Sequence, residues 1–441
     1  MSHAKPDNKY ELQNVDEPEL FRDMFPYTEL PRVVFEDESV APAPAERLMI
    51  SDTTFRDGQQ ARPPYAVQQV VDLFTLLHRL DGGTGLIRHS EFFLYSRKDR
   101  QAVEKCLELG FEFPKVTGWI RAVASDFKLV KQMKLTETGI LTSCSDYHIF
   151  LKLKKNRRQA MEQYLRIVKD ALAEGITPRC HLEDITRADF YGFVAPFATE
   201  LLKLRAETGV DIRIRLCDTL GFGVPWPNAA LPRSVPRLVD AMVRKVGYPG
   251  ELMEWHGHND FHKALINPVT AWLYGCSTCN GTLLGIGERT GNTPIEAMVI
   301  EAGQLRGQDP RINYRVITEI GEYYRERIGY HIPGNFPLVG REFNTTRAGI
   351  HADGLLKSEE IYSAFDTGSI LASPPSVAIT DKSGAAGIKH WIQANHNLDV
   401  PKDDTRLQAL RMTVEAEYEA GRTTAISDEE MDRWYALAFD H

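Results

Sequence analysis

The sequence contains no run of about 18 apolar residues, the length that a membrane-spanning helix needs. Its first residues, MSHAKPDNKYELQNVDEPEL, are polar and acidic and lack the apolar segment of a signal peptide. Positive charge is not in excess either, because 52 Lys and Arg stand against 61 Asp and Glu, a net charge of −9. These absences argue against a membrane protein and against a basic surface for nucleic acid. We expect local contacts to hold any anionic substrate.

Cysteine is also scarce, with six residues that lie mostly in apolar segments. This usage predicts reduced thiols in a cytoplasmic protein rather than a disulfide framework. Cys276 and Cys279 form a CxxC pair, but no second CxxC follows, so buried packing is favoured over a zinc site. No GxGxxG follows the first strand-like segment, and no GK[ST] ending marks a phosphate loop.

Strand-like and helical segments alternate with a regular spacing from Leu48 onward. The strand-like segments are 48–55, 86–93, 115–122, 137–145, 176–183, 211–219, 251–258 and 277–285. The helical patterns are 65–80, 97–109, 125–133, 155–174, 190–207, 235–246, 263–274 and 294–305. Eight such units within about 250 residues predict an α/β fold, a (β/α)₈ TIM barrel. A doubly wound open sheet is the alternative, without the GxGxxG that usually accompanies it.

The remaining segments predict the domain organisation. Residues 1–46 are rich in Pro, Glu and Asp, and we expect an N-terminal arm that lies over the body or over a neighbouring subunit. Residues 47–308 form the predicted barrel, the catalytic domain. Residues 309–441 form a small, mainly helical C-terminal subdomain.

Polar residues that can bind a metal or take part in catalysis follow the first and seventh predicted strands. Arg56 and Asp57 follow the first strand in SDTTFRDGQQ, and HGHND ends the seventh. Residues two apart on a strand point the same way, so His256 and His258 present both imidazoles on one face. Each motif alone is more often structural, an ion pair or hydrogen-bonded histidines. Together at the barrel's carboxyl edge they form a His₂Asp set, to which Asn292 of GIGERTGN could add an oxygen.

A divalent cation fits these ligand types. Asp, His and Asn suit Mn²⁺, Mg²⁺ or Co²⁺, with Zn²⁺ as a further candidate.

The motifs DTTFRDGQQ, HGHND and GIGERTGN, in this order, resemble the acyltransferase branch of the DRE-TIM metallolyases, which includes isopropylmalate, homocitrate and citramalate synthases. The resemblance extends over about residues 48–392, because TTRAGIHADGLLK and ITDKSGAAGIKHWI are similar to the subdomain that follows the barrel in this family. It implies a divalent metal held by Asp57, His256, His258 and Asn292, and a Claisen condensation of acetyl-CoA with a 2-oxo acid followed by thioester hydrolysis.

The resemblance also implies roles for other residues. Arg56 would stabilise the forming alkoxide, and Glu91 would orient the Arg56 side chain. His351 would be the acid/base of the subdomain, oriented by Glu183 or another carboxylate, and Thr219 would help to hold the 2-oxo acid. A homodimer is expected, as in the family. The long synthases of the family carry a further domain for feedback by leucine, and since the chain ends at His441 we expect no effector site of that type.

Departures from the family pattern bear on the substrate. Gln59 stands where most members have an acidic residue, and Phe261, His262 and Lys263 follow HND. With SEFFLYS (90–96) and GWIRA (118–122), these resemble most the Re-face citrate synthases of this family. The resemblance implies oxaloacetate as the 2-oxo acid. Its second carboxylate needs a cation, and Arg121 or Lys263 could supply one.

Three alternatives remain at this stage. A homocitrate or 2-isopropylmalate synthase would keep the mechanism and change the oxo-acid pocket. A biotin-dependent carboxyltransferase also has a metal barrel that opens with DTTFRD, but no biotinyl-lysine domain is evident. The third is a non-catalytic metal-binding scaffold.

Overall fold

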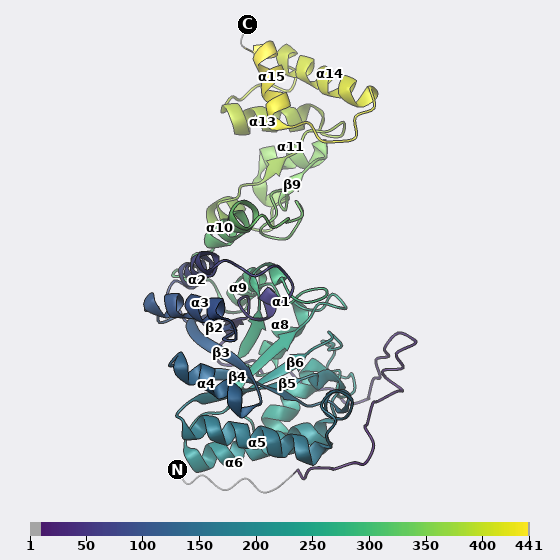
Figure 1. Ribbon diagram of the computed structural model, residues 1–441. Coiled ribbons are helices and arrows are strands. Elements are labelled where there is room, and N and C mark those ends of the chain that lie inside the picture. The colour runs from purple at the N-terminus through teal and green to yellow at the C-terminus, as the bar shows by residue number, and fades with distance from the viewer. Residues whose placement is uncertain (1–9, 440–441) are drawn as a thin grey trace. The chain divides into compact units, whose positions relative to one another are not determined.

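The computed structural model describes residues 10–439, and the chain divides into two compact units, Met1–Asn313 and Tyr314–His441. The first unit contains eight strands in a closed barrel, in the order of the sequence (Figure 1). Each strand pairs in parallel with its neighbours, and β1 pairs with β8 to close the barrel. The strands are β1 (Met49–Asp52), β2 (Ile87–Phe92), β3 (Lys115–Arg121), β4 (Glu137–Ser143), β5 (Thr177–Glu183), β6 (Arg213–Asp218), β7 (Met253–Gly257) and β8 (Thr278–Gly281). The predicted (β/α)₈ barrel is confirmed.

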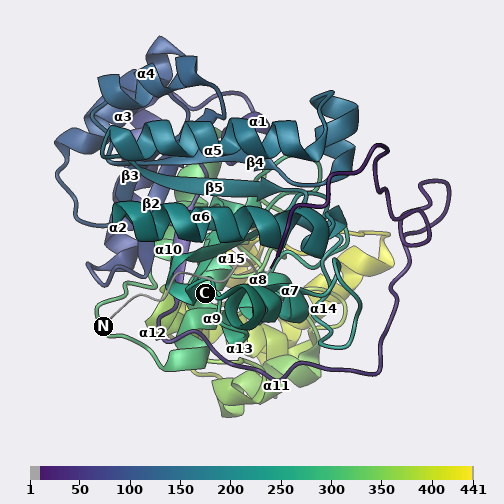
Figure 2. The ribbon, with the colours of Figure 1, turned by 90° about the horizontal axis from the view of Figure 1, so that it is seen from below.

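Helices follow the strands and cover the outside of the barrel. They are α2 (Val67–Asp81), α3 (Arg97–Glu108), α4 (Ala124–Gln132), α5 (Arg157–Ala173), α6 (Ala195–Thr208), α7 (Val235–Asp240), α8 (Ile266–Leu273) and α9 (Ile295–Arg306). Figure 2 shows α5 and α6 beside β5. Local sequence sets several ends: Ser96 and Asn156 accept hydrogen bonds from the first turns of α3 and α5, and Gly82 ends α2 in the left-handed conformation.

The interior of the barrel is filled by polar side chains. Alternation along the strands sends Ser51, Thr117, Arg179 and Glu254 inward from β1, β3, β5 and β7. The even-numbered strands contribute Glu91, Gly139, Arg215 and Asn280. TIM barrels commonly place Val, Ile and Leu at such positions. In this chain the apolar residues of the strands face the helices instead, where they are fully buried: Ile50, Ile87, Ile140, Leu182 and Leu216.

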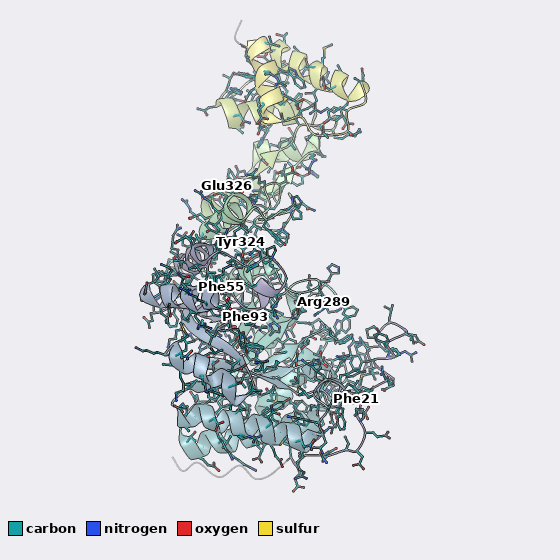
Figure 3. All side chains as sticks on the ribbon, viewed as in Figure 1. Phe21, Phe55, Phe93, Arg289, Tyr324 and Glu326 are labelled. Atoms are coloured by element: carbon teal, nitrogen blue, oxygen red, sulfur yellow. The ribbon has the colours of Figure 1, made fainter. Side chains whose placement is uncertain are left out.

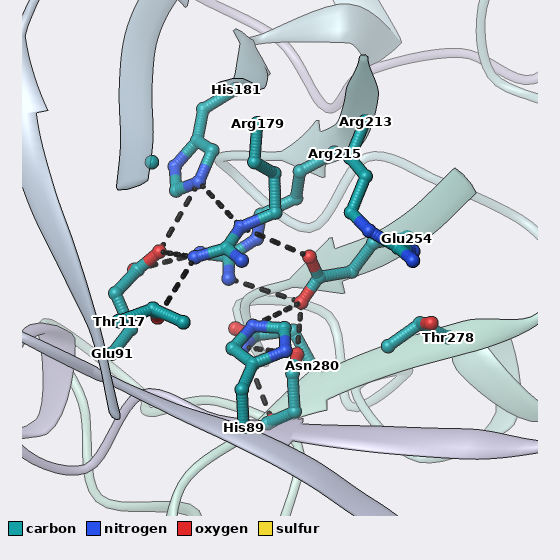
Figure 4. Close-up of polar contacts among 12 residues, drawn as sticks. His89, Glu91, Thr117, Arg179, His181, Arg213, Arg215, Glu254, Thr278 and Asn280 are labelled. Carbon is teal, nitrogen blue, oxygen red and sulfur yellow. Dashed lines mark hydrogen bonds and ion pairs between the residues drawn. The ribbon is translucent and has the colours of Figure 1, made fainter. Parts of the chain in front are cut away.

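Four of these interior residues form a closed ring of alternating charge, which we call the charge ring (Figure 4). Glu91 accepts hydrogen bonds from Arg179 Nη2 at 2.6 Å and from Arg215 Nη1 at 2.9 Å. Glu254 pairs with the same two arginines, at 3.4 Å to Arg179 Nε and 3.0 Å to Arg215 Nη2. Gly139 leaves room beside the ring, because a Cβ atom there would lie 2.7 Å from Glu91 Oε2. The ring balances two cations with two anions, and all four residues are buried.

Residues 10–46 of the N-terminal arm lie against the barrel. Residues 10–46 contain no helix or strand, only an isolated bridge between Phe35 and Ala229. The backbone N–H of Glu19 donates to Asp146 on the loop after β4, and the buried Phe25 ring packs 4.9 Å from Phe222. The arm therefore contacts the loops at the carboxyl ends of β4 and β6.

The second unit is mainly helical. Its longer elements are α10 (Val316–Tyr323), α11 (Gly349–Lys357), α13 (Gly384–His396), α14 (Thr405–Glu419) and α15 (Asp428–Phe439), with a short parallel pair, β9 (Thr345–Thr346) and β10 (Ser376–Val377). Its core is apolar and includes Leu355, Ile379, Trp391, Leu407 and Met431.

Two findings concern the chain as a whole. The six cysteines are buried and free. No helix within residues 10–439 is long and apolar enough to cross a membrane.

Candidate active site

One carboxylate and two imidazoles converge at the carboxyl end of the barrel. Asp57 begins the short helix α1 (Asp57–Gln60) after β1, His256 is the fourth residue of β7, and His258 follows that strand. Their ligand atoms all lie within 4.8 Å of one another. Asp57 Oδ2 is 3.9 Å from His256 Nε2 and 3.5 Å from His258 Nε2. All three residues are buried.

Asn292 lies beside this group. An isolated bridge pairs its backbone with that of His258, and its Nδ2 donates to Asp57 Oδ2 at 2.7 Å. Its Oδ1 atom is buried and has no hydrogen-bond partner. The amide thus presents nitrogen to the carboxylate. A half-turn about χ2 would exchange its two ends and bring the unsatisfied oxygen to the same place.

The electrostatics of the group suit a cation. Burial lowers the pKa of His256 to about 3 and lowers that of His258, so both rings are neutral at pH 7. Burial raises the pKa of Asp57, but the Arg56 guanidinium and the two histidines outweigh it, and the net pKa is below the ordinary range. A carboxylate and two neutral imidazoles can each offer a lone pair toward their common centre. Together with the orphaned Asn292 oxygen, they are a donor set that fits a divalent metal.

Arg56 is held between two carboxylates. Its Nε donates to Glu91 Oε1 and its Nη1 donates to Asp57 Oδ1, both at 3.0 Å. Glu91 is fully buried, which raises its pKa, yet Arg215 and His181 lead the interactions that hold its net pKa well below the usual range. Glu91 is therefore a permanent acceptor that fixes the direction of the Arg56 fork.

Glu183 and Thr219 are committed to neighbouring groups of the rim. Glu183 Oε2 lies 3.0 Å from His148 Nδ1 and 3.2 Å from Lys152 Nζ. Burial opposes its ionisation, but His148 and Lys152 lower the pKa of Glu183 to about 2. The Thr219 hydroxyl accepts a hydrogen bond from the backbone N–H of Asp184 at 2.8 Å. The structure places both residues at the ends of β5 and β6, without a direct contact to the three convergent ligands among the residues described.

Arg121 and Lys263, the two candidate cations for the second carboxylate of a substrate, differ in their ion pairs with the protein's own carboxylates. Arg121 forms a fork with Asp126, at 3.0 and 3.1 Å, and its side chain is 61% exposed. Lys263 is half-buried, and its Nζ contacts the carbonyl oxygen of Phe261 at 3.2 Å. Burial first and Arg233 second lower the pKa of Lys263. Asp218 opposes this lowering, but no ion pair between Lys263 and a carboxylate is present within residues 10–439.

Arg289 ties three rim loops together. It belongs to the loop after β8 (Figure 3), where its backbone has a φ of +58°. Its Nε donates to Asp260 at 2.8 Å, and its Nη2 donates to the carbonyl oxygen of Thr219 at 2.6 Å. A left-handed arginine costs conformational energy, which these contacts offset.

His351 lies in the second unit, in the first turn of α11. Its Nδ1 is 3.2 Å from the hydroxyl of Thr346, and its ring centroid is 4.4 Å from that of Tyr362. Among residues 314–439, the Thr346 hydroxyl contacts the imidazole and no carboxylate does.

Sequence reasoning missed the residues that support the site from below. Arg179, Arg215 and Asn280 lie within predicted strands, and the only available signal was their alternation with apolar residues. Asn280 Oδ1 lies 2.7 Å from His256 Nδ1, a contact that requires knowledge of how β7 and β8 lie in register.

Comparisons with known proteins add to this geometry. The chain matches the family model described as HMGL-like over residues 47–323. It is 56% identical over 428 residues to the citrate (Re)-synthase of Syntrophus aciditrophicus, covering 96% of this chain and 68% of that protein. It is 50% identical to the citrate (Re)-synthase of Clostridium kluyveri, covering 96% of this chain and 94% of that protein.

More distant relatives extend the comparison. The 2-phosphinomethylmalate synthase of Streptomyces hygroscopicus is 36% identical, covering 97% of this chain and 98% of that protein. The solved HMG-CoA lyase of Bacillus subtilis superposes with a TM-score of 0.51 at 17% identity, covering 66% of this chain and 96% of that one. This last likeness concerns the fold.

Proposed function

Since the chain belongs to the HMGL-like family, we propose that it is an acyltransferase that condenses acetyl-CoA with oxaloacetate and releases citrate and CoA. The identity of 50% and 56% to two citrate (Re)-synthases, each over 96% of this chain, carries the proposal. The reaction forms one carbon–carbon bond between the acetyl methyl carbon and the keto carbon of oxaloacetate. Water then cleaves the thioester, so that CoA leaves as a free thiol.

A divalent metal belongs to this proposal. Asp57, His256 and His258 would hold it, and Asn292 would join them after a half-turn of its amide. Mn²⁺, Mg²⁺ or Co²⁺ are the metals we expect, with Zn²⁺ as a further candidate. When bound, such an ion supplies Lewis acidity that makes the keto carbon of the oxo acid more electrophilic.

Arg56 is assigned to the charge that develops on the keto oxygen. Glu91 and Asp57 occupy its Nε and Nη1 groups, and within residues 10–439 its Nη2 makes no hydrogen bond. The two carboxylates hold the guanidinium in place before the substrate arrives, so its remaining N–H groups act without reorganisation. Glu91 acts through Arg56 and exchanges no proton, because its pKa lies well below the usual range against the opposing effect of burial.

The other assignments concern proton removal and substrate binding. His351 takes the proton from the acetyl methyl group in this proposal, supported by the motif HADG and by the Thr346 contact to its Nδ1. Glu183 is the carboxylate assigned to support acid/base chemistry, and Thr219 donates its hydroxyl proton to the oxo acid. Lys263 is favoured over Arg121 for the second carboxylate, because Asp126 already balances the charge of Arg121.

A metal-dependent thiol-release assay tests the function. The full chain is treated with EDTA and given Mn²⁺ or Mg²⁺, and CoA release from acetyl-CoA is followed with oxaloacetate, 2-oxoglutarate, 2-oxoisovalerate and pyruvate. We expect release that depends on the metal and is fastest with oxaloacetate, with citrate as the product. Preference for another oxo acid would replace citrate synthase by a homocitrate or isopropylmalate synthase. No release with any of them would leave a carboxyltransferase or a metal-binding scaffold.

The proposal includes a cytoplasmic homodimer. The irregular arm of residues 10–46 and the helices after the barrel support it as surfaces suited to a second copy. Sedimentation velocity of the full chain distinguishes a dimer from a 49.9 kDa monomer.

A further inference from the structure

A chain of hydrogen bonds leads from Glu254 through Ser51 and Asn280 to His256, and the donor and the acceptor of each bond are fixed. The chain starts at Glu254 of the charge ring, whose carboxylate accepts from the Ser51 hydroxyl and from Arg215. An ionised carboxylate cannot donate, so the hydroxyl hydrogen of Ser51 points to Glu254. The lone pairs of the Ser51 oxygen are then available to a donor on its other side.

Asn280 supplies that donor. Its Nδ2 lies 2.8 Å from Ser51 Oγ and 3.2 Å from the carbonyl oxygen of Ser51. A carbonyl oxygen accepts and never donates, so the amide cannot be turned the other way without placing two oxygens together. The Oδ1 end of Asn280 therefore faces His256, and both Ser51 and Asn280 are fully buried.

The orientation of Asn280 decides which imidazole nitrogen of His256 carries the proton. Oδ1 of Asn280 lies 2.7 Å from Nδ1 of His256, and an amide oxygen only accepts. Nδ1 must be the donor, so the neutral ring has its lone pair on Nε2. That atom faces Asp57 Oδ2 at 3.9 Å, in the group that converges at the barrel rim.

We propose that Asn280 is a positioning residue that keeps the His256 proton on Nδ1 and thereby reserves Nε2 for a divalent cation. Without Asn280, the ring could carry its proton on Nε2 and form a hydrogen bond to Asp57. The Nε2 lone pair would then be unavailable to a cation. The inference rests on the metal site of the proposed function, but it makes a claim about metal affinity that needs neither acetyl-CoA nor an oxo acid.

Metal affinity of three variants tests the proposal. The EDTA-treated full chain is titrated with Mn²⁺, and free Mn²⁺ is measured by electron paramagnetic resonance. In Asn280→Leu the acceptor is lost, and the Kd for Mn²⁺ should rise about 10- to 100-fold. In Asn280→Asp the acceptor for His256 Nδ1 remains, although the donor to Ser51 is lost, and the Kd should rise clearly less than in Asn280→Leu.

A matched control separates this effect from the general cost of losing a buried amide. Asn267 is also buried and donates to the carbonyl oxygen of Gly223 at 3.0 Å, and it forms no hydrogen bond with His256. Asn267→Leu should leave the Kd for Mn²⁺ unchanged. An unchanged Kd in Asn280→Leu, or an equal rise in Asn267→Leu, would overturn the proposal.

The tautomer itself can be observed without any variant. In the metal-free wild type labelled with ¹⁵N-histidine, long-range proton–nitrogen correlation spectra identify the protonated nitrogen of each ring. For His256 we expect the proton on Nδ1, and a proton on Nε2 would refute the proposal even if Asn280→Leu fails to fold. If metal affinity responds as expected while no citrate forms in the thiol-release assay, the positioning role stands and the proposed function fails.

Discussion

Replacing Glu91 with glutamine removes the charge that holds three arginines together inside the barrel. Glu91 accepts hydrogen bonds from Arg56, Arg179 and Arg215, and its side chain is fully buried. A glutamine has almost the same shape, but one of its two ends donates hydrogen bonds. That NH₂ group would face arginine N–H groups, and the charge ring would keep two cations with one anion.

The expected cost follows from the burial of the ring. Removing one partner of a buried ion pair costs about 3–5 kcal/mol, because the partner's charge stays desolvated. This is a large part of the free energy of unfolding of a folded domain, which is about 5–15 kcal/mol. At roughly 2–4 °C per kcal/mol, the melting temperature of the first unit should fall by about 6–20 °C. Activity should fall as well, because Arg56 loses the acceptor that fixes its direction.

Differential scanning calorimetry at pH 6 measures this effect, with Glu296→Gln as the matched control. Glu296 is also buried, but its Oε2 accepts from the backbone N–H of Leu284, and no arginine within residues 10–439 pairs with it. The control should melt no lower than the wild type. A Glu91→Gln protein that melts within about 2 °C of the wild type would refute the reasoning, because the ring would then not depend on its charge balance.

Four further outcomes are expected. Arg56→Lys should lower kcat about 10²- to 10³-fold in the thiol-release assay, since a single ammonium cannot replace the fork; near-normal turnover would remove Arg56 from the mechanism. Lys263→Met should raise the KM for oxaloacetate about tenfold or more, while Arg121→Ala leaves it within about threefold; the reverse order would transfer the second carboxylate to Arg121. His351→Asn should abolish exchange of the acetyl methyl protons with deuterated water, observed by mass spectrometry; retained exchange would require another base. Burial raises the pKa of Glu296 to about 7, so the folded state holds its proton more tightly than the unfolded chain does. The contribution of this group to the free energy of unfolding is therefore lost as pH rises from about 4.5 to 7. Glu296→Gln should increase the free energy of unfolding by about 3 kcal/mol over the wild type at pH 8 and not at pH 4, and an increase independent of pH would contradict this.

The barrel itself could be predicted from the sequence because its signals are local. Each strand and helix has its own pattern of apolar residues, and their regular alternation predicts parallel strands. The strand ends were less certain. The sequence predicts one strand over 277–285, but β8 ends at Gly281, because a turn over Leu283–Gly285 redirects the chain toward Asn292. Polar segments at the rim have a strand-like sequence pattern, but their hydrogen bonding to the sheet ends before the pattern does.

The convergence of Asp57, His256 and His258 followed from two local motifs and the rule that strand ends meet at one rim. The support beneath them could not be derived in this way. Arg179 and Arg215 alternate with apolar residues just as exposed strand residues would, and only the register of β2, β5, β6 and β7 shows that they meet Glu91. The orientation of Asn280 depends on Ser51, which lies 229 residues away in the chain.

The closed ring of alternating charge has a consequence for how this sequence can change over evolutionary time. Every member of the ring contacts two others of opposite sign, so a neutral residue at any one position strands a charge in the interior. Within the ring, two simultaneous replacements, one acidic and one basic, keep the number of cations equal to the number of anions. Substitutions at Glu91, Arg179, Arg215 and Glu254 should therefore appear in pairs among diverging homologues, one acidic residue together with one basic residue, and lineages that lack a single member of the ring should be rare.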